Sequence, residues 1–315
     1  MHTREGWNPK VSEHTVTALG GRPCAARGRL EPVDFLVLTT TGVFAVLAVA
    51  FHQRVAGWQV LVAEDLAVAA VFLAAVVGTH RIRMGWVWFV ARTATVSLAY
   101  AFLFGAVARL QLIVHGRWLD GVVVGFEQHL FGVQPTIWLE RFTLPWLTEW
   151  MMFAYVVYIA LYPLVCLVIY TRHGERALEE CLLALGLANV ACDLGFILFP
   201  VAGPAAFMGP AYTVPLKGWL FTAVGELVRT RLHYVGGSLP SPHAAAATVM
   251  WAMSWRYSRR LAWILAPIIL TLYIATFYCR YHYLTDAIAG IATAVVALAV
   301  TPRLMRWWRE RFASM

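Results

Sequence analysis

The sequence predicts an all-α integral membrane protein, a polytopic helical bundle of about eight transmembrane helices. Hydrophobic residues make up 60% of the 315 residues and charged residues only 13%, and the mean hydropathy is +0.66. Soluble domains are about half apolar and about a quarter charged, so this composition excludes an ordinary soluble protein. The apolar residues also fall into runs of about 20, the length of a helix that crosses a bilayer.

The N-terminal region 1–33 is polar and basic and has no early apolar run, so we expect a cytoplasmic tail and not a cleavable signal. An N-terminal group of transmembrane helices should follow within 34–106. The expected spans lie near residues 35–52, 57–79, 85–106, 149–171, 178–200, 243–257, 260–278 and 284–302.

Between the third and fourth spans, 107–148 mixes tryptophans with charged residues and helix breakers, which is typical of helices that lie in the membrane interface. The Gly- and Pro-rich segment 201–242 is the longest loop between the later spans. We expect 107–302 to form one catalytic membrane domain, followed by a basic tail at 303–315.

Basic residues predict the orientation of the chain in the membrane. Sixteen of the 25 lysines and arginines lie in the N-terminal tail, at 81–83, at 172–176, at 256–260 and at 303–311. With the expected spans, all these groups fall on one side, which the positive-inside rule identifies as cytoplasmic. Both termini are then cytoplasmic, and the loop 201–242 and the turn 279–283 are extracytoplasmic.

A short motif, Pro240-Ser241-Pro242-His243, precedes the sixth expected span. Ser241 suits the N-cap of a helix and Pro242 its first position, so His243 would project from the first turn. Unpaired amides at such a terminus attract anions, and a histidine there can donate a proton to a leaving oxygen on bound phosphate. Ser241 is also a candidate phosphate-binding residue. Taken alone, the motif is better explained as a chance capping sequence followed by a structural histidine.

A second motif, His282-Tyr283-Leu284-Thr285-Asp286, begins the eighth expected span. His282 and Asp286 are four positions apart, which places both side chains on one helix face and lets the carboxylate bind the imidazole. The other ring nitrogen is then free to act as a nucleophile or base, as in a catalytic triad. Both motifs fall on the same expected side of the membrane and together predict a phosphoryl-transfer site.

Several cations flank the two motifs on the side where the positive-inside rule predicts few, namely Lys217, Arg229, Arg231 and Arg280. Cationic side chains bind phosphoryl oxygens, and guanidinium groups do so in bidentate geometry. Lys217, Arg231 and Arg280 are therefore candidate phosphate-binding residues. Contact with lipid headgroups or solvent is an equal alternative for each of them.

Polar residues inside the expected spans have simpler interpretations. Arg92, in the third span, is expected to extend its guanidinium to the cytoplasmic edge of the membrane. Asn189 and Asp193, four apart on the fifth span, are expected to form hydrogen bonds between helices.

The motifs together resemble the type 2 phosphatidic acid phosphatase (PAP2) superfamily, and more narrowly its branch that includes fungal inositol phosphorylceramide synthase. The resemblance covers about residues 110–300 and includes the block Phe199-Pro200-Val201-Ala202-Gly203-Pro204, which is similar to the branch's proline-rich element. It implies a six-helix catalytic core in which His282 becomes phosphohistidine, Asp286 orients it, and His243 is the general acid and base. It implies no metal and no cofactor.

The sequence also departs from the wider family. The Lys-x6-Arg-Pro element of the phosphatases is missing, and Thr276 occupies the position of an arginine six residues before the motif histidine. The phosphotransferase-like branch lacks these elements too, which favours that branch. Ala205 stands where many bacterial relatives have arginine. Pro242 replaces the usual glycine or leucine but is compatible with a helix start, and Gly290 follows the third motif as in the family.

The sequence therefore predicts a lipid phosphatase or inositolphosphotransferase-like enzyme that acts on a lipid phosphoester within the bilayer, without nucleic acid. A transporter or scaffold is one alternative, because it would also have eight spans and scattered charges, but it does not require histidine and aspartate at these spacings. A metal-dependent hydrolase is another, because His243, His282 and Asp286 are possible ligands. A serine hydrolase built on Ser238 or Ser241 lacks the Gly-x-Ser-x-Gly elbow.

Overall fold

The computed structural model describes residues 29–231 and 234–312, and every regular element in these ranges is a helix. Most of the expected tail 1–33 therefore lies outside the described residues. The elements are α1 (Pro32–Ala50), α2 (Trp58–His80), α3 (Gly85–Val107), α4 (Asp120–Phe131), α5 (Pro135–Trp138), η3 (Leu139–Phe142), α6 (Pro145–Leu198), α7 (Pro204–Phe207), η4 (Gly209–Ala211), α8 (Leu220–Arg231), α9 (Pro242–Tyr257), α10 (Arg259–Tyr278) and α11 (Leu284–Phe312).

Helix α6 is a hairpin of two antiparallel segments. Its 54 residues are more than twice the length that crosses a bilayer. At Gly174 the backbone leaves the helical region, with φ 79° and ψ −169°, a conformation open to glycine because it has no Cβ. The Asn189 amide donates to the Tyr162 hydroxyl at 3.4 Å, so the two segments lie side by side. They correspond to the expected spans 149–171 and 178–200.

Six helices in the described part of the chain are long and apolar enough to cross a membrane, namely α1, α2, α3, α6, α10 and α11. The protein is therefore an integral membrane protein built as a polytopic helical bundle. Helix α9 corresponds to the expected span 243–257 but has only 16 residues. That length gives about 24 Å, against a hydrocarbon core of about 30 Å. The count of eight spans stays a prediction for this reason.

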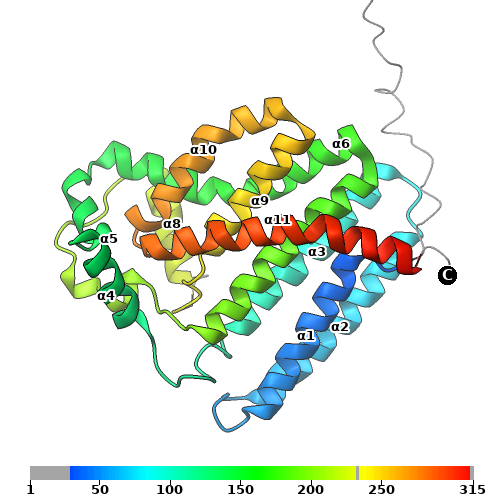
Figure 1. The fold of residues 1–315 in the computed structure, drawn as a ribbon, viewed down its shortest axis with the longest axis horizontal. Coiled ribbons are helices and arrows are strands. Elements are labelled where there is room, and N and C mark those ends of the chain that lie inside the picture. The colour runs from blue at the N-terminus through cyan, green and yellow to red at the C-terminus, as the bar shows by residue number, and fades with distance from the viewer. Residues whose placement is uncertain (1–28, 232–233, 313–315) are drawn as a thin grey trace, which may run out of the picture.

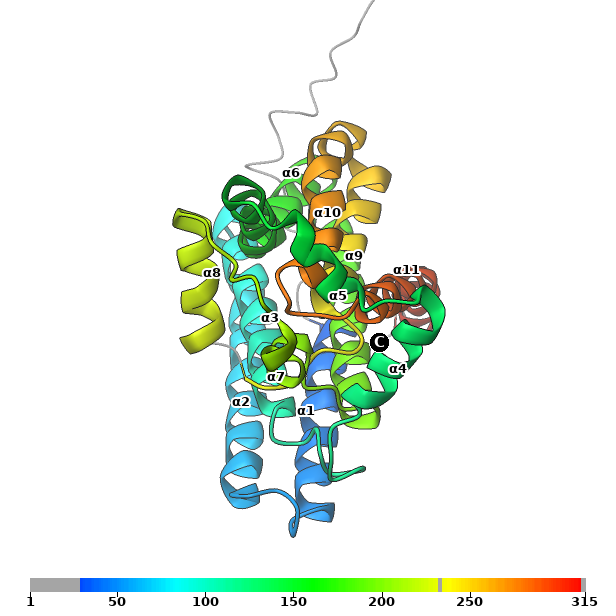
Figure 2. The same ribbon diagram turned by 90° about the vertical axis from the view of Figure 1, so that its left-hand side faces the viewer.

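Helix α6 is the centre of the bundle, because it contacts α1, α3, α8, α9, α10 and α11. Helices α1 to α3 pack on one another, and α1 and α3 pack on α6, while α9 to α11 form a second group (Figure 1). Helices α4, α5, α7 and α8 gather at the end of the bundle where α11 begins, which faces the viewer in Figure 2. The short helices therefore cover one end of the long ones.

Basic side chains gather at the other end of the bundle. A cavity of about 420 Å³ is lined there by side chains from the α6 turn, the end of α9 and the last turns of α11, including Arg176, Arg256 and Arg306. A neighbouring cavity of about 280 Å³ adds Arg29 and the end of α2. Helix α11 continues through most of the expected basic tail. Those basic groups that lie within the described residues thus share one end of the molecule.

Arg92 is buried, which corrects the expectation that it extends to the membrane edge. Its guanidinium donates to both carboxylate oxygens of Glu179, at 2.7 and 2.8 Å, and to Asp34 at 2.6 Å. The three side chains belong to α1, α3 and α6, and none is more than 5% exposed. Losing one partner of such a buried group costs about 3–5 kcal/mol, because a charge is left uncompensated. The ion triad therefore fixes the N-terminal helices on α6.

Glu31, directly before α1, should make the stability of this end depend on pH. Burial, followed by repulsion from Glu179, raises the pKa of Glu31 from 4.5 to about 7; Arg92 lowers it, and Asp34 and Glu175 raise it further. The folded protein therefore favours the protonated form. This stabilisation is complete below about pH 4.5 and is lost as the pH rises through about 7.

This shift in the pKa of Glu31 corresponds to about 3 kcal/mol in the free energy of unfolding. The detergent-solubilised protein should therefore unfold at a lower temperature at pH 8 than at pH 5. Glu31→Gln should remove most of that difference, because the amide has no proton to lose. The same pH dependence in both proteins would contradict the assignment to Glu31.

Candidate active site

The N-terminus of α9 has the capping arrangement that the sequence predicts. Ser241 is the N-cap, and its hydroxyl accepts a hydrogen bond from the Ala244 amide at 3.3 Å. Pro242 is the first helical residue, and His243 follows in the first turn. The Ser241 amide donates to the Asp286 carbonyl at 2.9 Å. This bond joins the start of α9 to the start of α11.

His282 lies in the turn before α11 and not on a helix face, because α11 begins only at Leu284. Its Nδ1 is 3.6 Å from Asp286 Oδ2, too far for a hydrogen bond, but 3.0 Å from the Ser238 carbonyl oxygen. A carbonyl can only accept, so this contact assigns the proton to Nδ1 and the lone pair to Nε2. The backbone of Ser238 thus takes the orienting place that the sequence assigns to Asp286.

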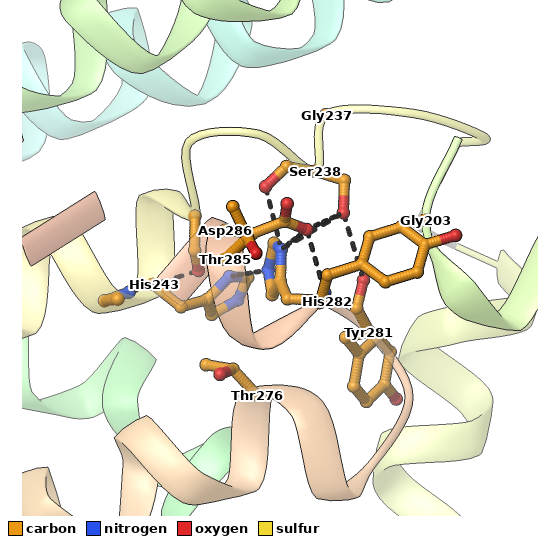
Figure 3. A network of polar contacts seen from close by, with 12 residues as sticks. Gly203, Gly237, Ser238, His243, Thr276, Tyr281, His282, Thr285 and Asp286 are labelled. Atoms are coloured by element: carbon orange, nitrogen blue, oxygen red, sulfur yellow. Dashed lines mark hydrogen bonds and ion pairs between the residues drawn. The ribbon is translucent and has the colours of Figure 1, made fainter. Parts of the chain in front are cut away.

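The two motif histidines face each other, as Figure 3 shows, with His282 Nε2 3.3 Å from His243 Nδ1. His282 is 2% exposed, whereas His243 is partly exposed. The Tyr155 ring of α6 stacks on His243, with ring centroids 4.4 Å apart, and also on Tyr281 at 4.2 Å. The structure therefore brings together the two side chains on which the phosphoryl-transfer hypothesis depends.

Asp286 is fully buried and reaches His282 through Ser238. Its Oδ2 accepts hydrogen bonds from the Ser238 hydroxyl at 2.6 Å and from the Tyr283 amide at 2.9 Å. The Ser238 hydroxyl oxygen is also 3.4 Å from His282 Nδ1 (Figure 3). From the sequence, the only role suggested for Ser238 is that of a hydrolase nucleophile. In the structure its hydroxyl proton is directed to Asp286, so Ser238 connects the carboxylate with the imidazole.

Two buried carboxylates on α4 connect the motif segments, although the sequence alone indicates no specific role for either. Asp120 accepts hydrogen bonds from the amides of 202–203, at 2.8 and 3.0 Å, and from the Tyr283 hydroxyl at 2.9 Å. Glu127 accepts one from the Thr285 amide at 2.8 Å. Both carboxylates are 0% exposed, and burial raises the pKa of each. Helix α4 therefore holds the proline-rich block and the start of α11 in place.

The proline-rich block reaches the site through Gly203. Its φ of 96° is a conformation that favours glycine. A Cβ at this position would lie 3.2 Å from the Tyr281 carbonyl oxygen and 3.3 Å from the Ser238 hydroxyl oxygen. The three segments of the resemblance thus converge on one place, although they are far apart in the sequence.

Gly290 lets α11 pack directly on the first turn of α9. A Cβ there would collide with the Ser241 carbonyl oxygen and would lie 3.2 Å from both Ala244 Cβ and the Ala245 nitrogen. We expect Gly290→Ala to push the two helix starts apart, at a cost of about 1–3 kcal/mol in the free energy of unfolding. Displacing a reacting group by about 1 Å can cost about 10²-fold in rate, so activity should fall strongly.

Turnover and thermal unfolding of Gly290→Ala should be compared with those of Gly78→Ala. Gly78 lies on α2 and has open space around its Cβ position. The control should therefore behave like the wild type. Equal activity of both variants would show that the close packing of α9 and α11 does not set the site geometry.

The guanidinium of Arg280, a candidate phosphate ligand, is already paired in the structure. It forms an ion pair with Glu140 at 3.0 Å and donates to the Val214 carbonyl oxygen. It also lies over the Tyr212 ring, 4.1 Å from the centroid. Arg280 therefore holds the loop after η4 against η3.

The other flanking cations are spread over the loop before α8 and over α8 itself. Lys217 and Arg231 are exposed, and no hydrogen bond or ion pair joins either to the histidine pair within the described ranges. Arg229 forms an ion pair with Glu226 on its own helix. The structure thus does not gather the predicted cations around the histidines.

A metal site is the main alternative use of the two histidines and Asp286. Within residues 29–231 and 234–312, no three His, Cys, Asp or Glu side chains lie together in a way that could hold a metal ion. Asp286 Oδ2 accepts hydrogen bonds from the Ser238 and Tyr283 donors, whereas its Oδ1 is buried without a hydrogen-bond partner among the described residues. The observed contacts suit acid–base and nucleophilic chemistry by the imidazoles.

Comparison with known proteins agrees with this arrangement. The family model of the PAP2 superfamily matches residues 123–300, which is more than half of the chain and contains all three motif segments. Over 109 residues the chain is 27% identical to a PA-phosphatase related-family protein of Dictyostelium discoideum. That match covers 32% of this chain and only 19% of the other protein. No solved structure matches the chain significantly. Its motif segments and the extent of the family match show that the chain belongs to the PAP2 superfamily.

Proposed function

We propose that the protein is a lipid phosphatase or phosphotransferase whose reaction passes through a phosphohistidine on His282. The observation that carries this proposal is the 3.3 Å approach of His282 Nε2 to His243 Nδ1, while the Ser238 carbonyl fixes the other nitrogen of His282. One imidazole is thus oriented as a nucleophile, and the second lies where it can hold or release a proton.

In the proposed reaction, His282 Nε2 attacks the phosphorus of the phosphoester, and the bond from phosphorus to the leaving oxygen breaks. Protonated His243 gives its proton to that oxygen, so the first product leaves as an alcohol. His243 then takes a proton from the accepting hydroxyl as its oxygen attacks phosphorus and the N–P bond breaks. Water as acceptor gives a phosphatase, and an alcohol gives a phosphotransferase. Asp286, acting through Ser238, stabilises the positive charge on the His282 ring.

An amphiphilic substrate suits the surroundings of the histidines. His243 lines a mostly apolar cavity of about 670 Å³, whose other walls are α3 and α6. Val90 and Ile159 also line it and are 54% and 62% exposed, so the cavity borders the surface that would meet lipid. A lipid phosphoester can therefore enter sideways from the bilayer. Thr276 at the position of the phosphatase arginine favours the inositolphosphotransferase-like branch.

Phosphate binding in this proposal relies on the start of α9. Backbone amides and the positive end of a helix bind anions, and His243 lies in the same turn. Ser241 contributes mainly as the cap that forms this terminus. Lys217 and Arg231 stay candidates for long-range attraction of the anion, whereas Arg280 would first have to leave Glu140.

The site is proposed to face the extracytoplasmic side, with both termini in the cytoplasm. The support is the gathering of basic side chains at the end of the bundle opposite the motifs. Cysteine labelling with a membrane-impermeant reagent tests this orientation. A cysteine placed at exposed Lys217 should react in intact cells, and one placed at exposed Arg303 should not.

The function is tested by phosphoryl transfer from a panel of lipid phosphates in EDTA, with water and added alcohols as acceptors. We expect turnover without divalent cations and an acid-labile, alkali-stable phosphoprotein in rapidly quenched samples. The ratio of free phosphate to phosphorylated alcohol then separates phosphatase from phosphotransferase. Turnover that depends on a divalent cation, or no turnover on any substrate, would overturn the proposal.

A further inference from the structure

The cavity beside His243 contains a carboxylate without a partner. Asp193 of α6 lines this cavity and is 3% exposed. The sequence predicts hydrogen bonds between helices for Asn189 and Asp193. Asn189 makes one, to Tyr162, but in the described part of the chain no hydrogen bond or ion pair reaches Asp193. Asp193 lies five residues before Leu198, the last residue of α6. It is therefore about 7.5 Å from that end, measured along the helix axis.

An isolated carboxylate in a membrane helix is energetically costly, and one that also lines a cavity marks a candidate site for a compensating ligand. The Arg92 site of the same protein illustrates the usual solution, because Asp34 and Glu179 there share a guanidinium. No lysine or arginine among the described residues lines the cavity around Asp193. Apart from His243, whose proton the proposed reaction uses, a positive charge beside Asp193 would have to come from outside the chain.

The rest of the cavity wall suits a cation with an apolar chain. Its aromatic members are Phe89, Tyr100, Phe104, Tyr158 and Tyr162. Aromatic faces attract ammonium groups, most strongly where water is excluded. Thr93 adds a hydroxyl that is buried and has no hydrogen-bond partner among the described residues. A neutral hydroxyl on the ligand would satisfy Thr93 but would give Asp193 no positively charged partner.

We propose that this cavity binds the cationic amine of an amphiphile, with Asp193 as the counter-ion. Since His243 lines the same cavity, the amine belongs to the alcohol that His243 protonates or deprotonates. The substrate class is thus a phosphoester or acceptor alcohol that carries both an amine and an acyl or alkyl chain. This assignment to a substrate rests on the proposed function, whereas binding of the amine does not.

Binding is tested first, in a His282→Ala background that cannot turn over the ligand. The probes are dodecylamine and dodecanol at equal mole fraction in the detergent micelle, and the readout is the ligand-dependent rise in unfolding temperature. The amine should stabilise this protein clearly more than the alcohol does. Asp193→Asn should weaken amine binding by about tenfold or more, because only the charge is lost.

Asp65→Asn is the matched control. Asp65 is likewise a fully buried carboxylate on a spanning helix, its oxygens have no partner among the described residues, and it does not line this cavity. It should leave amine binding unchanged. Equal stabilisation by amine and alcohol, or undiminished amine binding by Asp193→Asn, would overturn the proposal.

A second measurement separates this inference from the proposed function. With otherwise active protein, kcat/KM is compared for lipid phosphoesters whose alcohol does or does not carry an amine, in the wild type and in Asp193→Asn. A preference for the amine in the wild type, lost in the variant, supports both proposals. Amine binding without turnover of any phosphoester would support the cavity assignment and contradict the enzymatic one. Turnover without amine preference would support the enzymatic proposal and contradict the assignment of the amine to the substrate.

Discussion

Alanine at His282 is expected to abolish phosphoryl transfer, with a loss in kcat/KM of at least about 10⁴-fold, as for removal of other enzymatic nucleophiles. The Ser238 carbonyl binds Nδ1 of His282 and thereby orients its Nε2 toward His243. Without this imidazole no phosphoprotein should form, whatever the leaving group. The measurement is the stoichiometry of acid-labile phosphate on rapidly quenched protein, together with steady-state turnover.

His243→Ala should behave differently, and this difference tests the assignment of roles. General acid–base groups contribute about 10²–10⁴-fold, and an aryl phosphate with an acidic leaving group needs little help from an acid. The variant should therefore form phosphohistidine from such a substrate but discharge it slowly, so the phosphoprotein accumulates. His129→Ala, at an exposed position on α4, is the control and should match the wild type. Phosphoprotein in His282→Ala, or none in His243→Ala with an aryl phosphate, would refute these roles.

Removal of the Asp120 carboxylate should have a large effect on stability. Asp120→Ala leaves three buried donors without an acceptor, two amides at 202–203 and the Tyr283 hydroxyl. Each such group costs about 1–3 kcal/mol, so unfolding should become easier by about 3 kcal/mol or more. Because Tyr283 is next to His282, activity should also fall by about 10²-fold through loss of alignment.

Two milder variants make the Asp120 prediction specific. Tyr283→Phe removes one donor together with its need for an acceptor, so its cost should be well below that of Asp120→Ala. Asp120→Asn keeps one acceptor oxygen, so its loss in the free energy of unfolding should lie between those of Tyr283→Phe and Asp120→Ala. Denaturant or thermal unfolding in detergent gives the order. If Asp120→Ala unfolds like the wild type, α4 does not hold the motif segments in place.

Local signals in the sequence predicted the parts of the site that depend on neighbouring residues. The capping of α9 by Ser241 and the position of His243 follow from residue preferences within one helical turn. The apolar runs likewise predicted the long helices, because bilayer thickness fixes their length. The turn at Gly174 could be placed between two expected spans for the same reason.

Long-range contacts were not predictable in this way. The four-residue spacing of His282 and Asp286 suggested a helical pair, but α11 starts after His282 and the Ser238 carbonyl lies closer. Asp120 and Glu127 looked like polar residues of an interfacial segment, because no neighbouring residue shows which distant amides donate hydrogen bonds to their carboxylates. Arg280 appeared free for phosphate only because its partner Glu140 is 140 residues away.

The wide sequence separation within the site has a consequence for the order of synthesis. Asp120 and the hydroxyl of Tyr283 are 163 residues apart, and Glu127 precedes its donor by 158. A growing chain therefore completes the cavity walls of α3 and α6 long before His282 leaves the ribosome. His282 arrives together with α11, when the bundle around it already exists. The pairing of His282 with His243 is thus assembled only in the last stage of synthesis.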